Sequence, residues 1–311
     1  MSAESDFRKA RAAVVRGRTA LLKGTNAEIV RLLKEADARI RVILAGQPTG
    51  YQQWALPRLQ REIAQTLAQF GERASGEIST AAGRAWQLGE DLIDKPLEAG
   101  GIRVLRATIG LQAIDVRALQ EMRAFMTERI KNIALEAANK INAELGLVVI
   151  GAQGPADAIG ATTRILGEVS RARARTIVRT ELARAFSVAS FERMGEAAKI
   201  VPGLKKQWRK SGKAHPRPHH DIIDGQIREV GKPFTVKPFG RGAVNLMFPH
   251  DPGAPASETI NCGCVVLPYK DDWKVEHPGR APGGLEAAPP VRDLLAAGAK
   301  PGPRRLGVRR Q

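Results

Sequence analysis

Cysteine is almost absent from this chain, which contains only two in 311 residues, Cys262 and Cys264. Aromatic residues make up 5%, a composition that disfavours an all-β core and favours helices. An apolar run of about 18 residues, as a membrane-spanning helix needs, is also lacking, since residues 145–152 form the best run. Arginines interrupt the N-terminal segment wherever a signal core would form. We therefore expect a protein of a cytoplasm, or of a particle assembled there, without membrane contact or a structural disulfide.

Acidic residues are scarce relative to basic ones. Lys and Arg number 49 against 32 Asp and Glu, for a formal net charge of +17. Residues 1–50 contain 10 basic and 5 acidic residues, and residues 201–250 contain 10 and 3. Basic surfaces bind polyphosphates by releasing counterions, so we expect non-specific electrostatic contact with DNA. The alternative is a basic surface that only keeps the protein in solution.

Hydrophobic periodicity predicts a helical N-terminal half. Apolar residues recur at helical spacing in residues 27–44, after Pro57, and from Leu111 to Leu145, the last pattern being the longest at roughly 35 residues. Residues 1–150 are thus predicted to form an elongated helical domain. Glycines and a proline in residues 146–160 mark its end.

The sequence pattern changes after the N-terminal domain. Residues 160–270 begin with a predicted helix over 171–195 and continue as short β-pieces between turn residues. The predicted fold class is therefore α+β, with a small α+β C-terminal module. Residues 273–311 are rich in Pro, Gly and Arg and are predicted to be a disordered basic tail. Four tail residues are candidates for weak nucleic-acid contact: Arg304, Arg305, Arg309 and Arg310.

The 171–195 helix carries one acidic residue on its apolar face. On a helical wheel Glu181 falls inside the arc of apolar side chains. A buried carboxylate needs a cation or hydrogen-bond donors, because leaving it unpaired costs several kcal/mol. Arg175 and Arg179 flank the arc and are available to a neighbouring segment. We interpret Glu181 as a member of a structural ion pair rather than as the acid of a transferase.

Histidines gather just upstream of the two cysteines. Zn²⁺ held by two thiolates and an imidazole is a common staple of loop-rich modules, and His220, Cys262 and Cys264 are the candidate ligands. The fourth ligand could be water, or one of three nearby side chains: His219, Asp224 or Asp251. The alternative is that the cysteines are two small buried residues in a turn and strand, with the histidines in a basic loop.

Two enzymatic interpretations and one structural interpretation remain open for the same segment. A Cys nucleophile with a His base needs a third group to orient the base, and spacing alone selects none. A metal nuclease would use His220 and Asp224 to polarise a water. However, Asp224 precedes Gly225 and favours a turn, and Pro249 and Pro252 predict a rigid turn around Asp251.

Taken in order, these segments resemble the phage Mu F-like head morphogenesis proteins, also described as minor capsid proteins. The similar segments are "RARTIVRTELARAFSVAS", "KKQW", "RPHHDIIDG", "FPHDPGAP" and "ETINCGCVVLPY". The resemblance covers about 100 residues and departs from the family pattern at Gly263, where a basic residue is expected, and at the additional His219. The matching positions are Arg179, Thr180, Glu181, Trp208, Arg217, His220, Asp224, Gly225, Pro249, Asp251, Pro252, Glu258, Asn261, Cys262 and Cys264.

The resemblance implies a protein carried in few copies in the head of a tailed phage or prophage. It would lie in the capsid interior or at the portal vertex, after assembly in the host cytoplasm, and act in head assembly or in DNA packaging and delivery. Its expected partners are the portal protein, scaffold or major capsid protein, and packaged DNA. The resemblance implies no catalytic residue, and the alternative is a metal-dependent, nuclease-like enzyme packaged with the genome.

Overall fold

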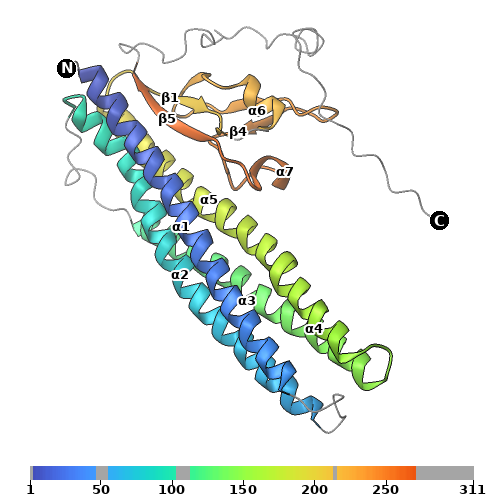
Figure 1. Ribbon diagram of the computed structural model, residues 1–311. Coiled ribbons are helices and arrows are strands. Elements are labelled where there is room, and N and C mark those ends of the chain that lie inside the picture. Colours follow the sequence, from blue (N-terminus) through green and yellow to red (C-terminus); the bar gives the residue numbers. More distant parts are fainter. Residues whose placement is uncertain (1–2, 47–54, 103–112, 213–215, 271–311) are drawn as a thin grey trace.

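The computed structural model describes residues 3–46, 55–102, 113–212 and 216–270. Long helices dominate it and precede a small sheet (Figure 1). The long helices and the helical segments between them are α1 (Ala3–Ala45), α2 (Leu56–Ala99), α3 (Ala113–Val149), α4 (Pro155–Arg164), a π-helical turn (Ile165–Ser170) and α5 (Arg171–Ile200). The predicted α+β fold class, with a helical N-terminal half, is confirmed, whereas the predicted disordered tail lies outside the described residues.

The first helix is longer than the sequence pattern predicts. Helix α1 begins at Ala3 rather than near residue 27, and α1 and α2, with 43 and 44 residues, both exceed α3, with 37. The prediction that the third helix is the longest is therefore wrong. The cause is visible in α1, where Phe7, Arg11, Val14 and Arg18 all lie on the buried face. Two arginines occupy apolar positions of the repeat, so the hydrophobic period is hidden.

Helix α2 packs against three other long helices, α1, α3 and α5. A close approach explains its contact with α5: a Cβ added at Gly89 would lie 2.4 Å from the backbone oxygen of Phe186. Further along the same two helices, Arg193 Nε donates to Asp94 at 2.6 Å in a largely buried ion pair. Helix α3 packs against α2 and α5 and is part of the same bundle.

The C-terminal module contains a three-stranded antiparallel sheet and a hairpin. Strand β1 lies between β2 and β5, and β1 and β5 pair with Trp208 opposite Val266. Strands β3 and β4 form the hairpin. Short helices α6 and α7 lie in the connections (Figure 1). The elements of the module are β1 (Leu204–Arg209), α6 (Pro218–Ile222), β2 (Ile227–Glu229), β3 (Phe234–Val236), β4 (Val244–Leu246), α7 (Ala256–Thr259) and β5 (Val265–Lys270).

A buried lysine joins the sheet to the hairpin. Lys206 of β1 has a fully buried side chain, and its Nζ donates to the carbonyl of Met247 at 2.7 Å. The ammonium also lies 5.0 Å and 5.1 Å from the ring centroids of Phe191 and Phe234, distances at which a cation is attracted to an aromatic face. Burial lowers the pKa of Lys206 to about 8.

Helix α1 contacts the module through its two buried arginines. Arg11 Nη1 donates to the carbonyl of Pro268 at 3.3 Å, and Arg18 Nη1 donates to the carbonyl of Gly263 at 3.4 Å. One cluster of buried apolar residues extends from Phe7 of α1 to Leu267 of β5. The domain boundary near residue 150 stays a prediction. Within the described part of the chain, none of the helices is long and apolar enough to cross a membrane.

Candidate metal centre

The loop between α7 and β5 carries both cysteines and is fixed on two sides. The backbone N–H of Asn261 donates to Thr180 Oγ1 of α5 at 3.0 Å. On the other side, Arg217 Nη2 donates to the carbonyl of Ile260 at 2.8 Å. Asn261 itself has a φ of 55°, a left-handed conformation that asparagine tolerates better than most residues. These contacts place Cys262 at a defined position beside α6.

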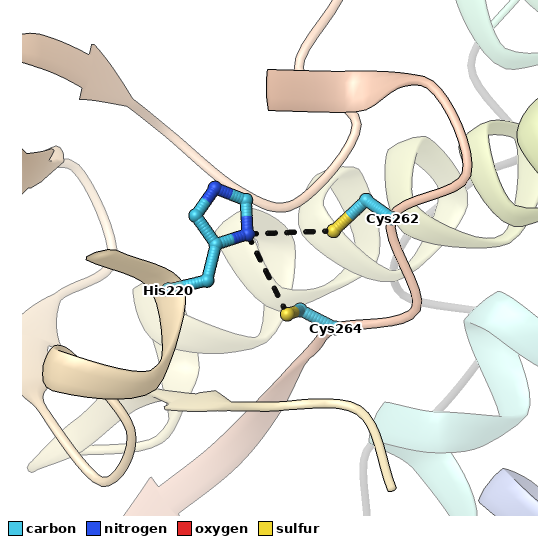
Figure 2. Close-up of side chains that lie close together, drawn as sticks. All are labelled: His220, Cys262 and Cys264. Atoms are coloured by element: carbon cyan, nitrogen blue, oxygen red, sulfur yellow. Dashed lines mark hydrogen bonds between the residues drawn. The ribbon is translucent and has the colours of Figure 1, made fainter. Parts of the chain in front are cut away.

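His220 of α6 brings the two thiols together. Its Nδ1 lies 3.6 Å from Cys262 Sγ and 3.7 Å from Cys264 Sγ, and Figure 2 shows both sulfurs on the same side of the ring. The three residues are 1%, 5% and 2% exposed, respectively. Their ligand atoms form a group compact enough to hold a metal ion. The structure therefore assembles the three side chains that the sequence predicts as ligands.

Glu258 orients the histidine from the opposite side of the ring. His220 Nε2 lies 2.9 Å from Glu258 Oε2, and His219 Nε2 lies 2.7 Å from the same oxygen. A carboxylate accepts hydrogen bonds, so His220 donates from Nε2 and, when neutral, directs the lone pair of Nδ1 toward the thiols. The indole of Trp208 packs edge-on against the imidazole, with centroids 5.3 Å apart. A carboxylate behind a histidine ligand is the usual outer support of a zinc site.

The spacing of the three atoms suits tetrahedral zinc. Zn–S bonds of about 2.3 Å and Zn–N bonds of about 2.0–2.1 Å at the tetrahedral angle place sulfur and nitrogen about 3.6 Å apart. The observed separations from Nδ1 are 3.6 Å and 3.7 Å. The donor set of two sulfurs and one imidazole is also the one that zinc prefers. The residues present therefore fit zinc.

The two thiols interact strongly with each other. Hydrogen bonding from Cys264 lowers the pKa of Cys262, and the contact with His220 lowers it further. The pKa of Cys264 is raised because its proton makes that hydrogen bond and because the side chain is buried. The pair thus readily carries one negative charge, and thiolate is the form that binds metals.

The structure does not bring the predicted fourth ligands to this group. His219 lies with Glu258 and His220 in a second cluster. Asp224 accepts from the backbone N–H of Lys210 at 2.9 Å and lies 3.6 Å from Arg209 Nη1. Asp251 accepts from the backbone N–H groups of Met247 and Gly253, each at 2.9 Å. Both aspartates therefore stabilise turns, as their flanking residues suggest.

Glu181, Arg179 and Gly225, which the sequence also singles out, are not members of the candidate ligand group. Glu181 is buried and paired with Arg184 at 2.6 Å and Arg129 at 3.5 Å, while Arg179 is exposed. Burial raises the pKa of Glu181, and the two arginines act against that rise. Gly225 adopts a φ of 83° and donates to the carbonyl of Trp208 at 2.8 Å.

Pro249 and the four tail arginines are further residues that the sequence singles out. Pro249 is buried in the turn before Asp251. The tail arginines, Arg304, Arg305, Arg309 and Arg310, lie outside the described residues.

Two further buried residues lie beside the thiols: Arg18, which sequence reasoning missed, and His250, one of the histidines that gather upstream of the cysteines. Arg18 of α1 interacts electrostatically with Cys262 and Cys264, although burial lowers the pKa of Arg18 to about 10. His250 is 1% exposed beside Cys262, has a φ of 67°, and is kept neutral because burial lowers its pKa to about 3. The only sequence signal for Arg18 is its spacing of seven residues from Arg11 on one helix face.

The geometry also bears on the enzymatic interpretations. Glu258 is the third group that a Cys–His pair would need, but Cys262 is 5% exposed and Cys264 only 2%, so a substrate carbonyl has no approach to either thiol. In a zinc hydrolase the general base must reach the metal-bound water. Glu258 lies on the Nε2 side of His220, away from the thiols. The burial of the three candidate ligands favours a structural role for the site.

Comparisons with known proteins support the resemblance seen in the sequence. A family model described as "Phage Mu protein F like protein" matches residues 120–267. The chain is 34% identical over 112 residues to the uncharacterized protein YqbB of Bacillus subtilis, a match that covers 35% of each chain. It is 33% identical over 105 residues to the NAD(+)--arginine ADP-ribosyltransferase EFV of Enterococcus faecalis. That match covers 33% of this chain and 20% of the transferase.

The chain thus spans about a third of the first relative and a fifth of the second. No solved structure matches it significantly.

Proposed function

We propose that the chain is a minor head protein of a tailed phage or prophage, because residues 120–267 match the model of the phage Mu protein F-like family. It is carried in few copies near the portal and acts in head assembly, or in DNA packaging and delivery, through structural contacts. The observation that carries the proposal is the convergence of the family-like motifs on one closed centre. Thr180 and Arg217 fix the loop that presents the buried cysteines, and Glu258 orients His220 beside it.

The helical part of the molecule suits a docking role. Helices α1 and α2, with 43 and 44 residues, have lengths of about 65 Å at 1.5 Å per residue. Such a bundle presents extended side surfaces to a large assembly. We propose that residues 1–150 dock onto the portal, scaffold or major capsid protein. The net charge of +17 favours non-specific contact with packaged DNA.

The centre is proposed to hold one Zn²⁺ through His220, Cys262 and Cys264. Zinc would supply a structural cross-link between α6 and the loop before β5, in a module whose strands are only three to six residues long. Glu258 keeps the imidazole oriented with Nδ1 toward the thiols. This role requires no access for substrate, in agreement with the burial of all three side chains.

Procapsid composition tests the proposed function. The gene is disrupted in the phage or prophage that encodes the chain, and procapsids are purified on gradients with and without complementation. We expect the protein in wild-type procapsids in substoichiometric amounts relative to the major capsid protein, retained when portal is present. Mass spectrometry gives the copy number. Absence of the protein from procapsids and from portal complexes would overturn the proposal.

The alternative of a packaged metal-dependent nuclease is less well supported, because the candidate metal ligands are buried. Purified protein with Zn²⁺, Mg²⁺ or Mn²⁺ is expected to leave DNA and RNA intact. The similarity to the ADP-ribosyltransferase covers only a fifth of that enzyme, so its activity does not carry over to this chain.

A further inference from the structure

Arg18 is an unusual residue for a helix core. Its side chain belongs to α1, far in sequence from the cysteines, and the residue is 5% exposed. A buried cation is costly unless negative charge or hydrogen-bond acceptors compensate it. Among the described residues, only Nη1 has a hydrogen-bond acceptor, the carbonyl of Gly263, whereas Nε and Nη2 have none.

The compensation available to Arg18 comes from the metal-binding loop. Gly263, whose carbonyl it contacts, lies between the two cysteines and carries no charge of its own. The guanidinium interacts electrostatically with both thiols. The ring of Phe186 also lies beside it, with its centroid 5.1 Å from Cζ. Arg18 thus brings a full positive charge to the loop that gathers two negatively charged zinc ligands.

We propose that Arg18 is a positioning residue of the metal centre, which fixes the Cys262–Cys264 loop and stabilises its negative charge when zinc is bound. The inference rests on the proposed zinc site. Arg18 lies outside residues 120–267, the segment that matches the family model. The metal centre is therefore completed by the N-terminal helix, and zinc affinity reports on whether α1 is docked against the module.

The same helix offers a matched control. Arg11 is also buried, donates to a backbone carbonyl of the same C-terminal segment, and lies 5.6 Å from a phenyl centroid, that of Phe7. Its acceptor is Pro268 in β5, four residues beyond Cys264. Arg11→Met and Arg18→Met therefore remove comparable buried contacts between α1 and the module, but only the second removes a charge beside the thiols.

Zinc affinity of the full-length protein tests the proposal, measured by competition with a chromophoric chelator. We expect Arg18→Met to weaken binding by about 10- to 100-fold, the usual effect of removing an outer support of a metal site. Arg11→Met should change it by less than about 3-fold. Arg18→Lys, which retains the charge, should lie closer to wild type than to Arg18→Met. The thiolate-to-cobalt absorption of the Co²⁺-substituted proteins gives a second measurement, which should rank the variants in the same order.

The possible outcomes distinguish a failure of the role of Arg18 from a failure of the zinc site itself. Tight zinc binding by the wild type with equal affinities for Arg11→Met and Arg18→Met would overturn the role of Arg18 and leave the zinc site intact. Failure of the wild type to bind zinc or cobalt would overturn both. Thermal unfolding of the two arginine variants with saturating zinc shows whether either has lost its fold.

Discussion

His220 uses its two ring nitrogens for different purposes. Nδ1 lies near both sulfurs and Nε2 near Glu258, within one buried side chain. A histidine that only fills space would need no carboxylate, and burying Glu258 at 3% exposure requires donors. His220 and Glu258 therefore satisfy one another's hydrogen-bonding groups. The pair matches a histidine ligand and the carboxylate that supports it at a metal site.

Only substitutions of the metal ligands are expected to remove the metal. We expect about one zinc per chain in protein purified without chelator, and Cys262→Ser or Cys264→Ser should each abolish it. A ligand at 100 times its dissociation constant stabilises a fold by about 2.7 kcal/mol, so a chelator should lower the melting temperature. Elemental analysis and thermal unfolding measure the two effects.

Asp224→Asn is the matched control, since Asp224 was a candidate ligand that the structure places in a turn. It should retain the zinc. If chelator-treated protein keeps its full stability, the two cysteines are small buried residues and nothing more.

Glu181 gives a test of pH dependence. Burial raises its pKa from the ordinary value of 4.5, more strongly than Arg184 and Arg129 lower it. The folded state therefore takes up a proton at higher pH than the unfolded chain, so wild-type stability contributed by this group rises as the pH falls toward 4.5. Glu181→Gln lacks this gain. We expect the free energy of unfolding of wild type to rise relative to that of the variant between pH 7 and pH 5.

Urea unfolding of wild type and Glu181→Gln, both in excess chelator, measures the difference without metal binding. If wild type loses stability relative to the variant on acidification, the two ion pairs, rather than burial, determine the direction of the pKa shift of Glu181.

At the residue scale, the sequence predicts which residues are ligands or are buried, but it does not predict which residues they contact. The three candidate ligands and the burial of Glu181 followed from residue type and helical periodicity. Arg129 of α3 could not be assigned as a partner of Glu181, since α3 and α5 approach one another only in the fold. Arg184, the other partner, lies three residues from Glu181 on the same helix, a spacing that the sequence contains. Lys206 and Arg18 contradict the rule that charged residues lie outside, and both are compensated by carbonyls and aromatic rings from distant segments.

At the scale of elements, helix α2 depends on one glycine. A Cβ at Gly89 would lie 2.7 Å from Ala189 Cβ as well as 2.4 Å from the carbonyl oxygen of Phe186, so α2 or α5 must move to admit it. We expect Gly89→Ala to destabilise the protein by about 1–3 kcal/mol, the usual effect of overpacking. The midpoint of urea unfolding measures it.

Gly76 of the same helix is the control, because a Cβ there has no neighbour within 4 Å. Gly76→Ala should stabilise the protein by about 0.4–1 kcal/mol through the unfolded chain and helix propensity. Equal effects at the two positions would show that α2 and α5 are not in close contact at Gly89.

The elements themselves were predictable to different degrees. The helix in residues 171–195 and the short strands followed from the change of period and from turn residues. The N-terminal part of α1 did not, since arginine replaces an apolar residue at two of its buried positions, Arg11 and Arg18. The order β2-β1-β5 pairs β1 with β5, which begins more than 50 residues after β1 ends, and periodicity contains no information about such pairing.

At the scale of the whole molecule, the contacts of α1 and α2 with the C-terminal module bear on how the chain folds. Arg11 and Arg18 bond to the module, Asp94 pairs with Arg193, and Gly89 lies against Phe186. The apolar face of α5 is therefore covered by helices that precede the predicted boundary near residue 150. A protein divided into independent domains would cover that face within residues 160–270.

A shortened protein separates these possibilities. We expect residues 155–270 alone to lack a cooperative unfolding transition and to aggregate, because removal of α1 and α2 exposes apolar side chains of α5, such as Phe186, that are about 1% exposed in the full chain. Residues 1–270 retain every described element and serve as the control, which should unfold at the temperature of the full chain. Calorimetry measures both. A sharp transition in the 155–270 fragment, with zinc bound, would show that the module folds by itself and that α1 is attached to a domain already formed.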